Sequence, residues 1–290
     1  MTLAPERHEG CAEVNGIRMN YVREGSGPLI MLIHGFPETS FAWRYVIPAL
    51  SKRFTVVAPD MRGYGLSDKP LDGYDKRTMA ADMRQLAGRL GFDKIKLMVG
   101  HDRGARVAHR CGLDFPEVVE RLAMLDLVPT REAMRTLDFN DAKRYWHWFF
   151  HLVPDVPEVL IGANIEAYIN MYFKNAYIRP AVDEALPVYV KSLGRVGALR
   201  SALADYRATF TADAAHDDAS AAAGDKLRMP TLLLWGDKGL TADREKMLEI
   251  WRNYAVNVAA ASVPECGYYM AEEQPLALAK HLLEFIASNS

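Results

Sequence analysis

Short runs of apolar residues alternate along the chain with segments whose apolar positions recur every three or four residues. The apolar runs predict buried strands at 29–33, 54–58, 95–99, 122–125 and 231–235, with a weaker strand opening at 256. Residues 77–90, 102 to about 113 and 275–287 have the helical period instead. Strand–helix alternation of this kind favours a mostly parallel sheet flanked by helices on both faces, which is an α/β fold.

The alternation stops between Pro129 and about Asp225. This segment is rich in aromatic residues and helical patterns, among them the run from Tyr145 to Phe150. We therefore expect an α/β core formed by residues 1–128 and 226–290, with an inserted helical cap at 129–225. The polar, Ala-rich run 212–226 is interpreted as a surface linker that returns to the core.

Composition narrows the class of protein. The chain has 290 residues, of which 50% are hydrophobic, and its formal net charge is −2, so nothing indicates a nucleic-acid surface. Its three cysteines are widely spaced, which predicts neither a disulfide framework nor a zinc site. The first residues lack the apolar stretch of a signal peptide, and the longest apolar runs are too short to span a membrane. We expect a soluble, cytoplasmic protein.

The segment Gly100-His101-Asp102-Arg103-Gly104 directly follows one of the predicted strands. Glycines on both sides of a carboxylate predict a strained strand-to-helix turn with Asp102 at its tip. A carboxylate needs no base to activate it, and it can displace a leaving group from an sp³ carbon to give an ester. A simple helix-capping aspartate is the alternative, but a cap does not need the flanking glycines.

Three other segments accompany this turn: His34-Gly35-Phe36-Pro37, the stretch 60–67, and the loop Glu265-Cys266-Gly267. In this order, the four motifs resemble those of the α/β-hydrolase fold. A nucleophilic aspartate narrows the resemblance to haloalkane dehalogenases, epoxide hydrolases and fluoroacetate dehalogenases. The first two families usually have Trp directly after the nucleophile, whereas this chain has Arg. The run Asp-Arg-Gly-Ala-Arg resembles fluoroacetate dehalogenases, as do the cap segments 145–148 and 205–208.

The resemblance implies roles for residues near the nucleophile. Asp102 would attack the carbon that bears the halogen, while Arg103 and Arg106 would hold the substrate carboxylate. These two arginines share a helix face, and a guanidinium fork matches a carboxylate with two hydrogen bonds; a pair of solvated arginines is the simpler alternative. The backbone N–H groups of Phe36 and Arg103 would form an oxyanion hole for hydrolysis of the ester.

Three cap side chains, His147, Trp148 and Tyr206, resemble the halide site of that family. Their N–H and O–H groups would stabilise the departing fluoride, although aromatic runs in caps also serve packing alone. Asp126, at the end of a strand, would orient the catalytic base. Asp237 is the alternative, but Gly239 stands where many relatives place this acid.

The position of the general base departs from the family pattern. The resemblance implies a histidine after Gly267, yet the chain has Tyr268 there. The reference pKa of a phenol is about 10, against about 6.5 for imidazole, so Tyr268 is a poor base for activating water. Three interpretations stay open: an engineered base knockout that traps the ester, a natural or redesigned variant with altered chemistry, and a pocket that binds without turnover.

Taken with the resemblance, the sequence predicts a hydrolase that cleaves the carbon–halogen bond of short 2-haloacids such as fluoroacetate through an aspartyl ester. Hydrolysis of the ester would be impaired by Tyr268. The reaction would need water but no metal or organic cofactor, and the family suggests a homodimer that binds neither nucleic acid nor membrane. The alternatives are a small-carboxylate binding protein and an epoxide hydrolase, which needs two cap tyrosines; Tyr206 is a candidate for one, and the sequence does not identify the second.

Overall fold

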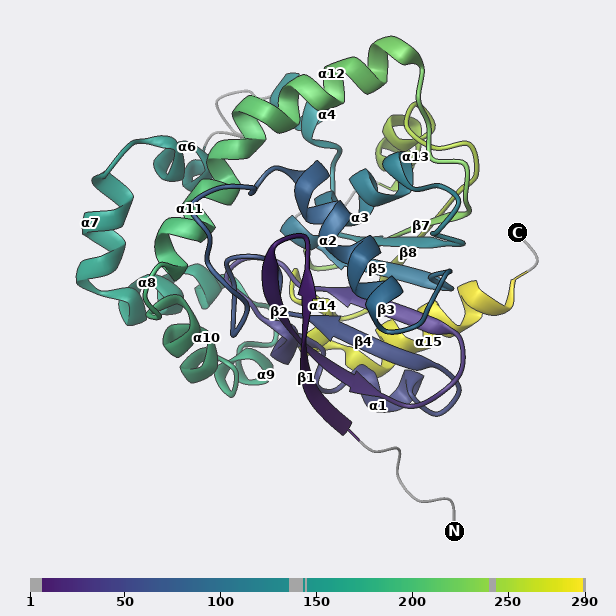
Figure 1. The fold of residues 1–290 in the computed structure, drawn as a ribbon, viewed down its shortest axis with the longest axis horizontal. Coiled ribbons are helices and arrows are strands. Elements are labelled where there is room, and N and C mark those ends of the chain that lie inside the picture. The colour runs from purple at the N-terminus through teal and green to yellow at the C-terminus, as the bar shows by residue number, and fades with distance from the viewer. Residues whose placement is uncertain (1–6, 136–142, 144, 240–243, 289–290) are drawn as a thin grey trace.

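The computed structural model describes residues 7–135, 143, 145–239 and 244–288. These residues contain one eight-stranded sheet in the order β1-β2-β4-β3-β5-β6-β7-β8 (Figure 1). The edge hairpin of β1 (Arg7–Val14) and β2 (Ile17–Glu24) is antiparallel, and β2 pairs antiparallel with β4 (Thr55–Pro59). The other neighbouring strands are parallel. The prediction of a mostly parallel α/β sheet is therefore confirmed.

The parallel strands correspond to the apolar runs. Besides β4 they are β3 (Leu29–Ile33), β5 (Leu97–His101), β6 (Leu122–Leu125), β7 (Thr231–Gly236) and β8 (Val258–Val263). Alternate residues of a strand face opposite sides of the sheet. Met31 and Ile33 accordingly join one hydrophobic cluster, whereas Ile30 and Leu32 join the other. A strand buried on both faces has no polar side to alternate with, which explains the continuous runs.

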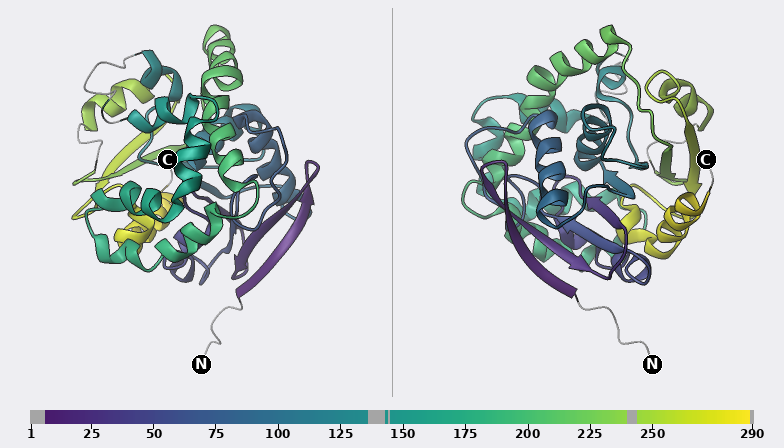
Figure 2. Two further views of the ribbon diagram at one scale, coloured as in Figure 1. Left: turned by 90° about the vertical axis from the view of Figure 1, so that its left-hand side faces the viewer. Right: turned by 45° about the vertical axis from the view of Figure 1, so that its right-hand side comes forward.

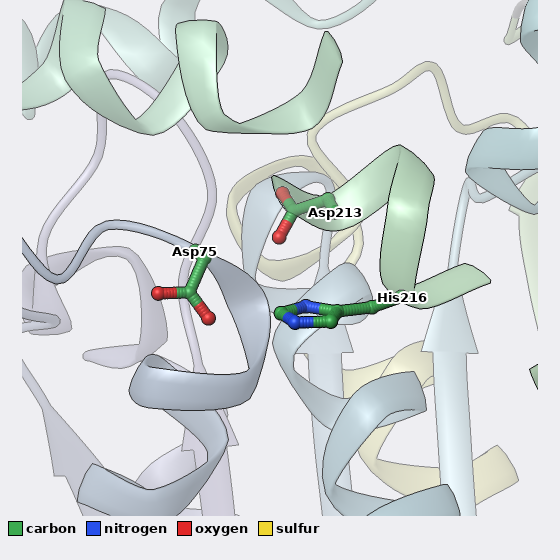
Figure 3. A group of neighbouring side chains, drawn as sticks. All are labelled: Asp75, Asp213 and His216. Carbon is green, nitrogen blue, oxygen red and sulfur yellow. The ribbon is translucent and has the colours of Figure 1, made fainter. Parts of the chain in front are cut away.

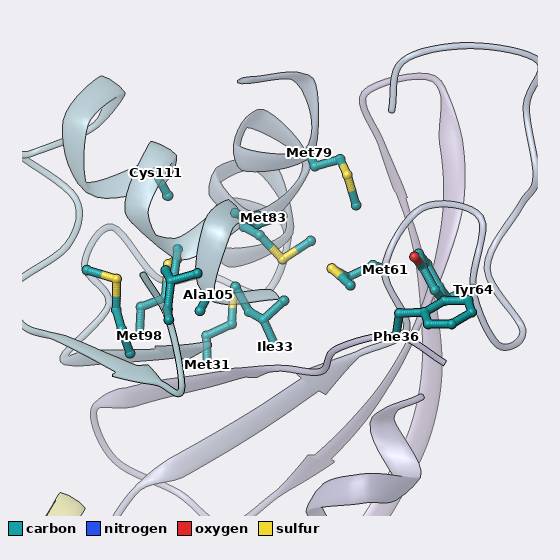
Figure 4. Close-up of a cluster of buried hydrophobic side chains, with 14 of the residues drawn as sticks. Met31, Ile33, Phe36, Met61, Tyr64, Met79, Met83, Met98, Ala105 and Cys111 are labelled. Atoms are coloured by element: carbon teal, nitrogen blue, oxygen red, sulfur yellow. The ribbon is translucent and has the colours of Figure 1, made fainter. Parts of the chain in front are cut away.

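Helices cover both faces of the sheet. On one face, α2 (Lys76–Arg89), α3 (Arg103–Asp114) and α13 (Arg244–Trp251) contribute to the larger hydrophobic cluster. Figure 4 shows part of that cluster, in which methionines of β3, β5 and α2 gather, with Phe36 and Tyr64 at one end. On the other face lie α1 (Ile47–Leu50), α14 (Met270–Glu273) and α15 (Pro275–Ala287), while the short η1 (Ser40–Trp43) follows β3.

The hairpin of β1 and β2 is an element that the apolar runs do not predict. Strand β1 lies at the edge of the sheet and exposes most of its residues, and β2 alternates buried with less buried positions, so neither contains a continuous apolar run. Asn15 and Gly16 form its two-residue turn with φ values of 45° and 77°. Asn-Gly between alternating residues is a strong hairpin signal because both positions need a positive φ.

Between β6 and β7 the described chain forms helices and no strand of the sheet: α4 (Thr130–Arg135), α6 (Trp146–Leu152), α7 (Val156–Ala163), α8 (Ile165–Tyr172), η2 (Phe173–Asn175), α9 (Arg179–Asp183), α10 (Leu186–Leu193), α11 (Ala198–Ala208), the π-helical η3 (Thr209–Asp213) and α12 (Ala214–Ala223). Helices α6 to α10 gather at one side of the sheet (Figures 1 and 2). The proposed domain boundaries at 129 and 225 stay a prediction.

The interpretation of 212–226 as a linker is wrong, because most of this run is helix α12. Alanine has the highest helix propensity, so an Ala-rich polar run favours a solvated helix over a coil. Gly224 follows the helix with φ 73°, which is a common way for a helix to end.

The cysteines agree with the prediction that the chain has no disulfide framework. Cys11 is exposed, Cys111 and Cys266 are buried, and all three are free. Within the described residues, no helix combines the length and the apolar character that crossing a bilayer requires.

Candidate active site

The turn after β5 holds Asp102 in a strained backbone conformation. Its φ of 52° and ψ of −115° are rare for a residue with a side chain, and such strain is concentrated at functional sites. A Cβ on Gly100 would lie 2.4 Å from the carbonyl oxygen of Gly104, and a Cβ on Gly104 would lie 2.4 Å from two carbonyl oxygens at the end of β3. The flanking glycines are therefore a steric requirement of the turn that presents Asp102.

Two hydrogen bonds hold the Asp102 carboxylate. The backbone N–H of Phe36 donates to Oδ1 at 2.9 Å, and the hydroxyl of Tyr268 donates to Oδ2 at 2.8 Å. Gly35 allows this approach, because a Cβ there would lie 2.6 Å from Cβ of Asp102. The structure thus brings a predicted oxyanion-hole donor and the residue at the expected base position to the same carboxylate.

Tyr268 is a hydrogen-bond donor at neutral pH. Its removal from water, followed by the charges of Asp102 and Asp126, raises the pKa of this phenol well above its usual value. Asp126 follows β6 with φ 49°. Asp237, the alternative acid, instead accepts a hydrogen bond from the backbone N–H of Cys266 at 3.3 Å. Of the two candidate acids, Asp126 is the one whose charge acts on Tyr268.

Glu273 fixes the loop that carries Tyr268. This buried carboxylate accepts from the backbone N–H groups of Gly267 at 2.7 Å and Tyr269 at 3.1 Å, on either side of the phenol. It also accepts from the N–H of Ile178, in the helical segment, at 3.2 Å. The sequence analysis did not identify Glu273, because nothing in its spacing distinguishes it from other acidic residues near the chain end.

Arg103 is fully buried and bound to a carboxylate of the helical segment. Its Nε and Nη2 donate to the Asp205 carboxylate at 3.1 and 2.7 Å, and Nη2 also donates to the Asp205 carbonyl and to the Thr209 hydroxyl, both at 2.7 Å. The guanidinium lies 4.4 Å from the ring centre of Tyr206. Among the described residues, Nη1 has no hydrogen-bond partner.

Arg106, one helical turn later, has neutral partners instead. Its Nη1 donates to the hydroxyl of Thr130 and, at 3.5 Å, to the carbonyl of Val128, while the guanidinium lies 4.8 Å from a ring centre of Trp148. Within the described chain, Nε is buried without a partner. Burial, and then the charge of Arg103, lower the pKa of Arg106. A cation in this environment favours the binding of an anion.

An aromatic cluster lies against Phe36. The rings of His151, Tyr172 and Tyr206 meet Phe36 edge to face, with ring centres 5.1 to 5.3 Å apart. His147 contacts Tyr172 at 5.4 Å and Tyr206 at 5.9 Å. Two of the predicted halide donors, His147 and Tyr206, are thereby brought together next to a residue that contacts the nucleophile.

The third predicted donor, Trp148, is buried beside Arg106. Its ring also packs against Tyr145 at 4.9 Å and Phe210 at 5.9 Å. These contacts place the indole in the packing around the arginine, while its predicted role towards a halide stays a prediction.

The polar groups of the aromatic cluster are neutral at neutral pH. Burial lowers the pKa of His147 to about 4, and burial raises the pKa values of Tyr172 and Tyr206 well above the usual value. The two phenol oxygens lie 3.4 Å apart. Tyr172 is therefore a second phenol of the site, which the sequence analysis did not single out.

His101, the residue before the nucleophile, is buried and charged. Its Nδ1 lies 3.2 Å from a carboxylate oxygen of Glu38, and its ring centre lies 4.8 Å from that of Tyr268. Burial opposes the charge, but Glu38 raises the pKa of His101 to about 9. A protonated imidazole cannot accept a proton from water, so His101 does not replace the missing base.

Asp75, Asp213 and His216 form a group with metal-ligand chemistry in the described part of the chain (Figure 3). Their ligand atoms lie within 4.8 Å of one another. However, Lys76 Nζ lies 3.4 Å from Asp213 Oδ2, and Asp75 accepts hydrogen bonds from the backbone and side chain of Thr78. An ammonium and a helix cap already use these carboxylates, so we assign no metal to them.

Two curated proteins with similar sequences are named for different reactions. A profile described as alpha/beta hydrolase fold matches residues 28–271. A soluble epoxide hydrolase from Corynebacterium sp. is 37% identical over 282 residues, which cover 95% of this chain and 96% of that protein. A fluoroacetate dehalogenase from Burkholderia sp. is 36% identical over 284 residues, which cover 95% and 92%.

A solved structure shares the fold over nearly the same length. A putative alpha/beta hydrolase from Nostoc sp. superimposes with a TM-score of 0.93 at 37% identity, over 97% of this chain and 98% of that one. The epoxide hydrolase and the dehalogenase resemble this chain about equally, so identity alone does not choose between their reactions.

Proposed function

The chain belongs to the α/β-hydrolase fold family, and on this basis we propose that it is a hydrolytic dehalogenase of short 2-haloacids such as fluoroacetate and chloroacetate. Asp102 is the proposed nucleophile, and Arg106 and Arg103 are the proposed partners of the substrate carboxylate. The ester that forms on Asp102 is hydrolysed slowly because Tyr268 stands at the position of the general base.

The observation that carries this proposal is the environment of Arg106. Its guanidinium is buried, its hydrogen-bond partners Thr130 and Val128 are neutral, and its Nε lacks a partner in the described residues. An ionised group removed from water is stabilised by an opposite charge. A substrate with a carboxylate adds a negative charge to that of Asp102, which already acts on Arg106, whereas a neutral epoxide adds none.

The chemistry of the first step follows from the position of Asp102. A carboxylate oxygen attacks the carbon that bears the halogen, a C–O bond forms, and the halide leaves with the electron pair of the C–X bond. His147 and Tyr206 are neutral N–H and O–H donors on the helical segment, and we assign them to the departing halide together with Trp148. Donors oriented in advance towards developing charge lower the barrier of such a step.

The second step requires water to attack the carbonyl carbon of the ester. The Phe36 N–H already donates to one oxygen of Asp102 and would stabilise the oxyanion. Deprotonation of the water needs a base, and the phenol of Tyr268 is protonated with a raised pKa. The alkylation step needs no such base, so the ester accumulates.

Intact-protein mass spectrometry with halide release tests the proposal. With chloroacetate or fluoroacetate we expect about one halide per subunit in a burst, a carboxymethyl group on Asp102, and slow turnover afterwards. Asp102→Asn is the matched control and should give neither the halide burst nor the carboxymethyl group. Halide release without an adduct at Asp102, or the absence of any halide release, would exclude the mechanism.

A second candidate function is supported by the pair of phenols. Tyr172 and Tyr206, with oxygens 3.4 Å apart, are two O–H donors near the nucleophile, as ring opening of an epoxide requires. An aryl epoxide should then alkylate Asp102 faster than a haloacid does. Comparing the two alkylation rates on the same preparation decides between these functions.

The remaining expectations are a homodimer, a cytoplasmic location and the absence of nucleic-acid or membrane partners. They stay predictions. Light scattering on the purified protein measures the first of them directly.

A further inference from the structure

We propose that Asp205 is a positioning residue for the substrate carboxylate: it orients the guanidinium of Arg103 so that Nη1 is left for the substrate. This inference rests on the proposed haloacid function. The two arginines of the site then differ, because Arg103 is held by a carboxylate of the protein and Arg106 is not.

Asp205 is placed to orient Arg103 completely. It is fully buried in α11, its two carboxylate oxygens accept from Nε and Nη2 of Arg103, and its backbone carbonyl accepts from Nη2 again. Thr209, the first residue of the π-helical η3, adds a hydroxyl at 2.7 Å from Nη2. These four acceptor atoms bind Nε and Nη2 and leave Nη1 as the nitrogen without a partner in the described chain.

Asp205 also balances charge around the site. Lys76 donates to Oδ1 and Tyr64 donates to Oδ2 at 2.7 Å, so one carboxylate serves four donor atoms together with Nε and Nη2 of Arg103. Burial opposes the charge of Asp205, but Arg103 and then Lys76 hold its pKa below the usual value. An ionised carboxylate can accept all of these bonds, whereas an amide has a single acceptor oxygen and would turn its NH₂ towards other donors.

These hydrogen bonds and charges predict the effect of Asp205→Asn. Loss of a negative charge near the site would, by electrostatics alone, strengthen the binding of an anion. Loss of the acceptors that orient Arg103 would weaken it. We expect the second effect to dominate, because the amide forces donor atoms together and the guanidinium must move.

The test is calorimetric binding of acetate, which has the carboxylate but no leaving group. We expect Asp205→Asn to raise the Kd of acetate about tenfold, roughly the loss of one hydrogen bond to a charged group. In an Arg103→Met background the same substitution should no longer weaken acetate binding, because only the electrostatic effect of the lost charge is left. Asp213→Asn is the control, because Asp213 contacts Lys76 at 3.4 Å and is not among the acceptors that bind Arg103 in the described part of the chain, and it should leave the Kd unchanged.

Each other outcome overturns the inference. Unchanged or tighter acetate binding by Asp205→Asn means that Asp205 acts only through its charge. A weakening that persists without Arg103, or that Asp213→Asn reproduces, means that it acts through Lys76 or through the fold. If Arg103→Met does not fold, the comparison of Asp205→Asn with Asp213→Asn decides: weakening by the first alone supports the inference, and any other result overturns it.

The test also separates this inference from the proposed function. Wild-type protein that binds acetate but releases no halide contradicts the dehalogenase and leaves the Asp205 comparison valid. Wild-type protein that binds no acetate contradicts the carboxylate site and, with it, the role of Asp205.

Discussion

The hydroxyl of Tyr268 lies 2.8 Å from Oδ2 of Asp102 and donates to it, so the residue at the expected base position contacts the nucleophile directly. A hydrogen bond to a charged acceptor contributes about 1.5–3 kcal/mol. It stabilises the carboxylate before reaction and weakens when the charge moves to the halide. In the proposed mechanism Tyr268 would therefore affect both steps, because it restrains alkylation and does not activate water.

Replacing Tyr268 by Phe should accelerate the halide burst, because Oδ2 loses a donor that competes with its attack on carbon. We expect an increase of about tenfold, the lower part of the range for a charged hydrogen bond. The slow phase after the burst should not change, since Phe provides no base. Rapid-quench measurement of halide release checks both phases, and a slower burst would mean that the Tyr268 hydroxyl assists alkylation.

Replacing Tyr268 by His should restore repeated turnover. An imidazole there has one nitrogen for Asp126 and another for water, whereas a phenol has a single oxygen. General-base catalysis is worth about 10²–10⁴-fold, and we expect steady-state halide release to rise by at least the lower value. Tyr268→Phe is the matched control. Equal steady-state rates in the two variants would place the base elsewhere.

Replacing Arg106 by Met should impair reactions of anionic substrates selectively. Loss of one partner of a buried charge pair costs about 2–5 kcal/mol, so the alkylation efficiency with chloroacetate should fall at least tenfold. Chloroacetamide, which has the same leaving group and no charge, should be a poor substrate of both proteins at similar rates. Alkylation rates from intact masses provide the measurement, and an equal loss with both compounds would refute a carboxylate site at Arg106.

Replacing Tyr206 by Phe should affect fluoroacetate more than bromoacetate. Fluoride is the poorer leaving group and depends more on donated hydrogen bonds, so we expect a loss of about 10²-fold with fluoroacetate and a smaller loss with bromoacetate. Tyr168→Phe is the control, because that hydroxyl contacts His151 at 2.6 Å. The rate of the halide burst, measured with fluoroacetate and with bromoacetate, checks this prediction. Equal losses with both would place Tyr206 outside the halide site.

His101 should make stability depend on pH above neutrality. Its pKa is raised from 6.5 to about 9 in the folded protein, so its contribution is present below pH 6.5 and is lost as pH rises through 9. A difference of this size corresponds to a contribution on the order of a few kcal/mol. The free energy of unfolding should fall between these pH values in wild type, and His101→Asn should remove most of that slope. A parallel slope in both proteins would show that another group titrates.

The sequence predicts the inner parallel strands of the sheet because a strand that is buried on both faces is a continuous run of apolar residues. The run 29–33 is apolar throughout, and β3 has the same bounds. The hairpin of β1 and β2 contains no continuous apolar run, so the apolar runs do not predict it, although Asn15-Gly16 indicates its turn. Helix α12 replaces the predicted linker because an Ala-rich polar run favours a solvated helix over a coil.

Whether a site residue can be predicted from the sequence also depends on whether its contacts are local or distant along the chain. The Gly-flanked Asp102 is visible in the sequence because five consecutive residues define its turn. The pairing of Arg103 with Asp205 joins residues 102 positions apart, and no local pattern encodes it. Tyr172 was not predicted for the same reason, since it meets Phe36 only when the helical segment packs against the core. Glu273 makes local bonds to the N–H groups of Gly267 and Tyr269, but its spacing does not distinguish it from other acidic residues.

The strained turn at Asp102 also bears on how such a site changes during evolution. Its shape is imposed by carbonyl oxygens that exclude a Cβ at Gly100 and Gly104, and not by the side chain at the tip. A residue with a Cβ at position 102 must adopt the same φ of 52°, which costs a β-branched side chain more than it costs an aspartate. The course of the backbone at position 102 is therefore set by its neighbours, and replacing Asp102 by another residue without a branch at Cβ should change the chemistry that the turn presents while the turn itself stays intact.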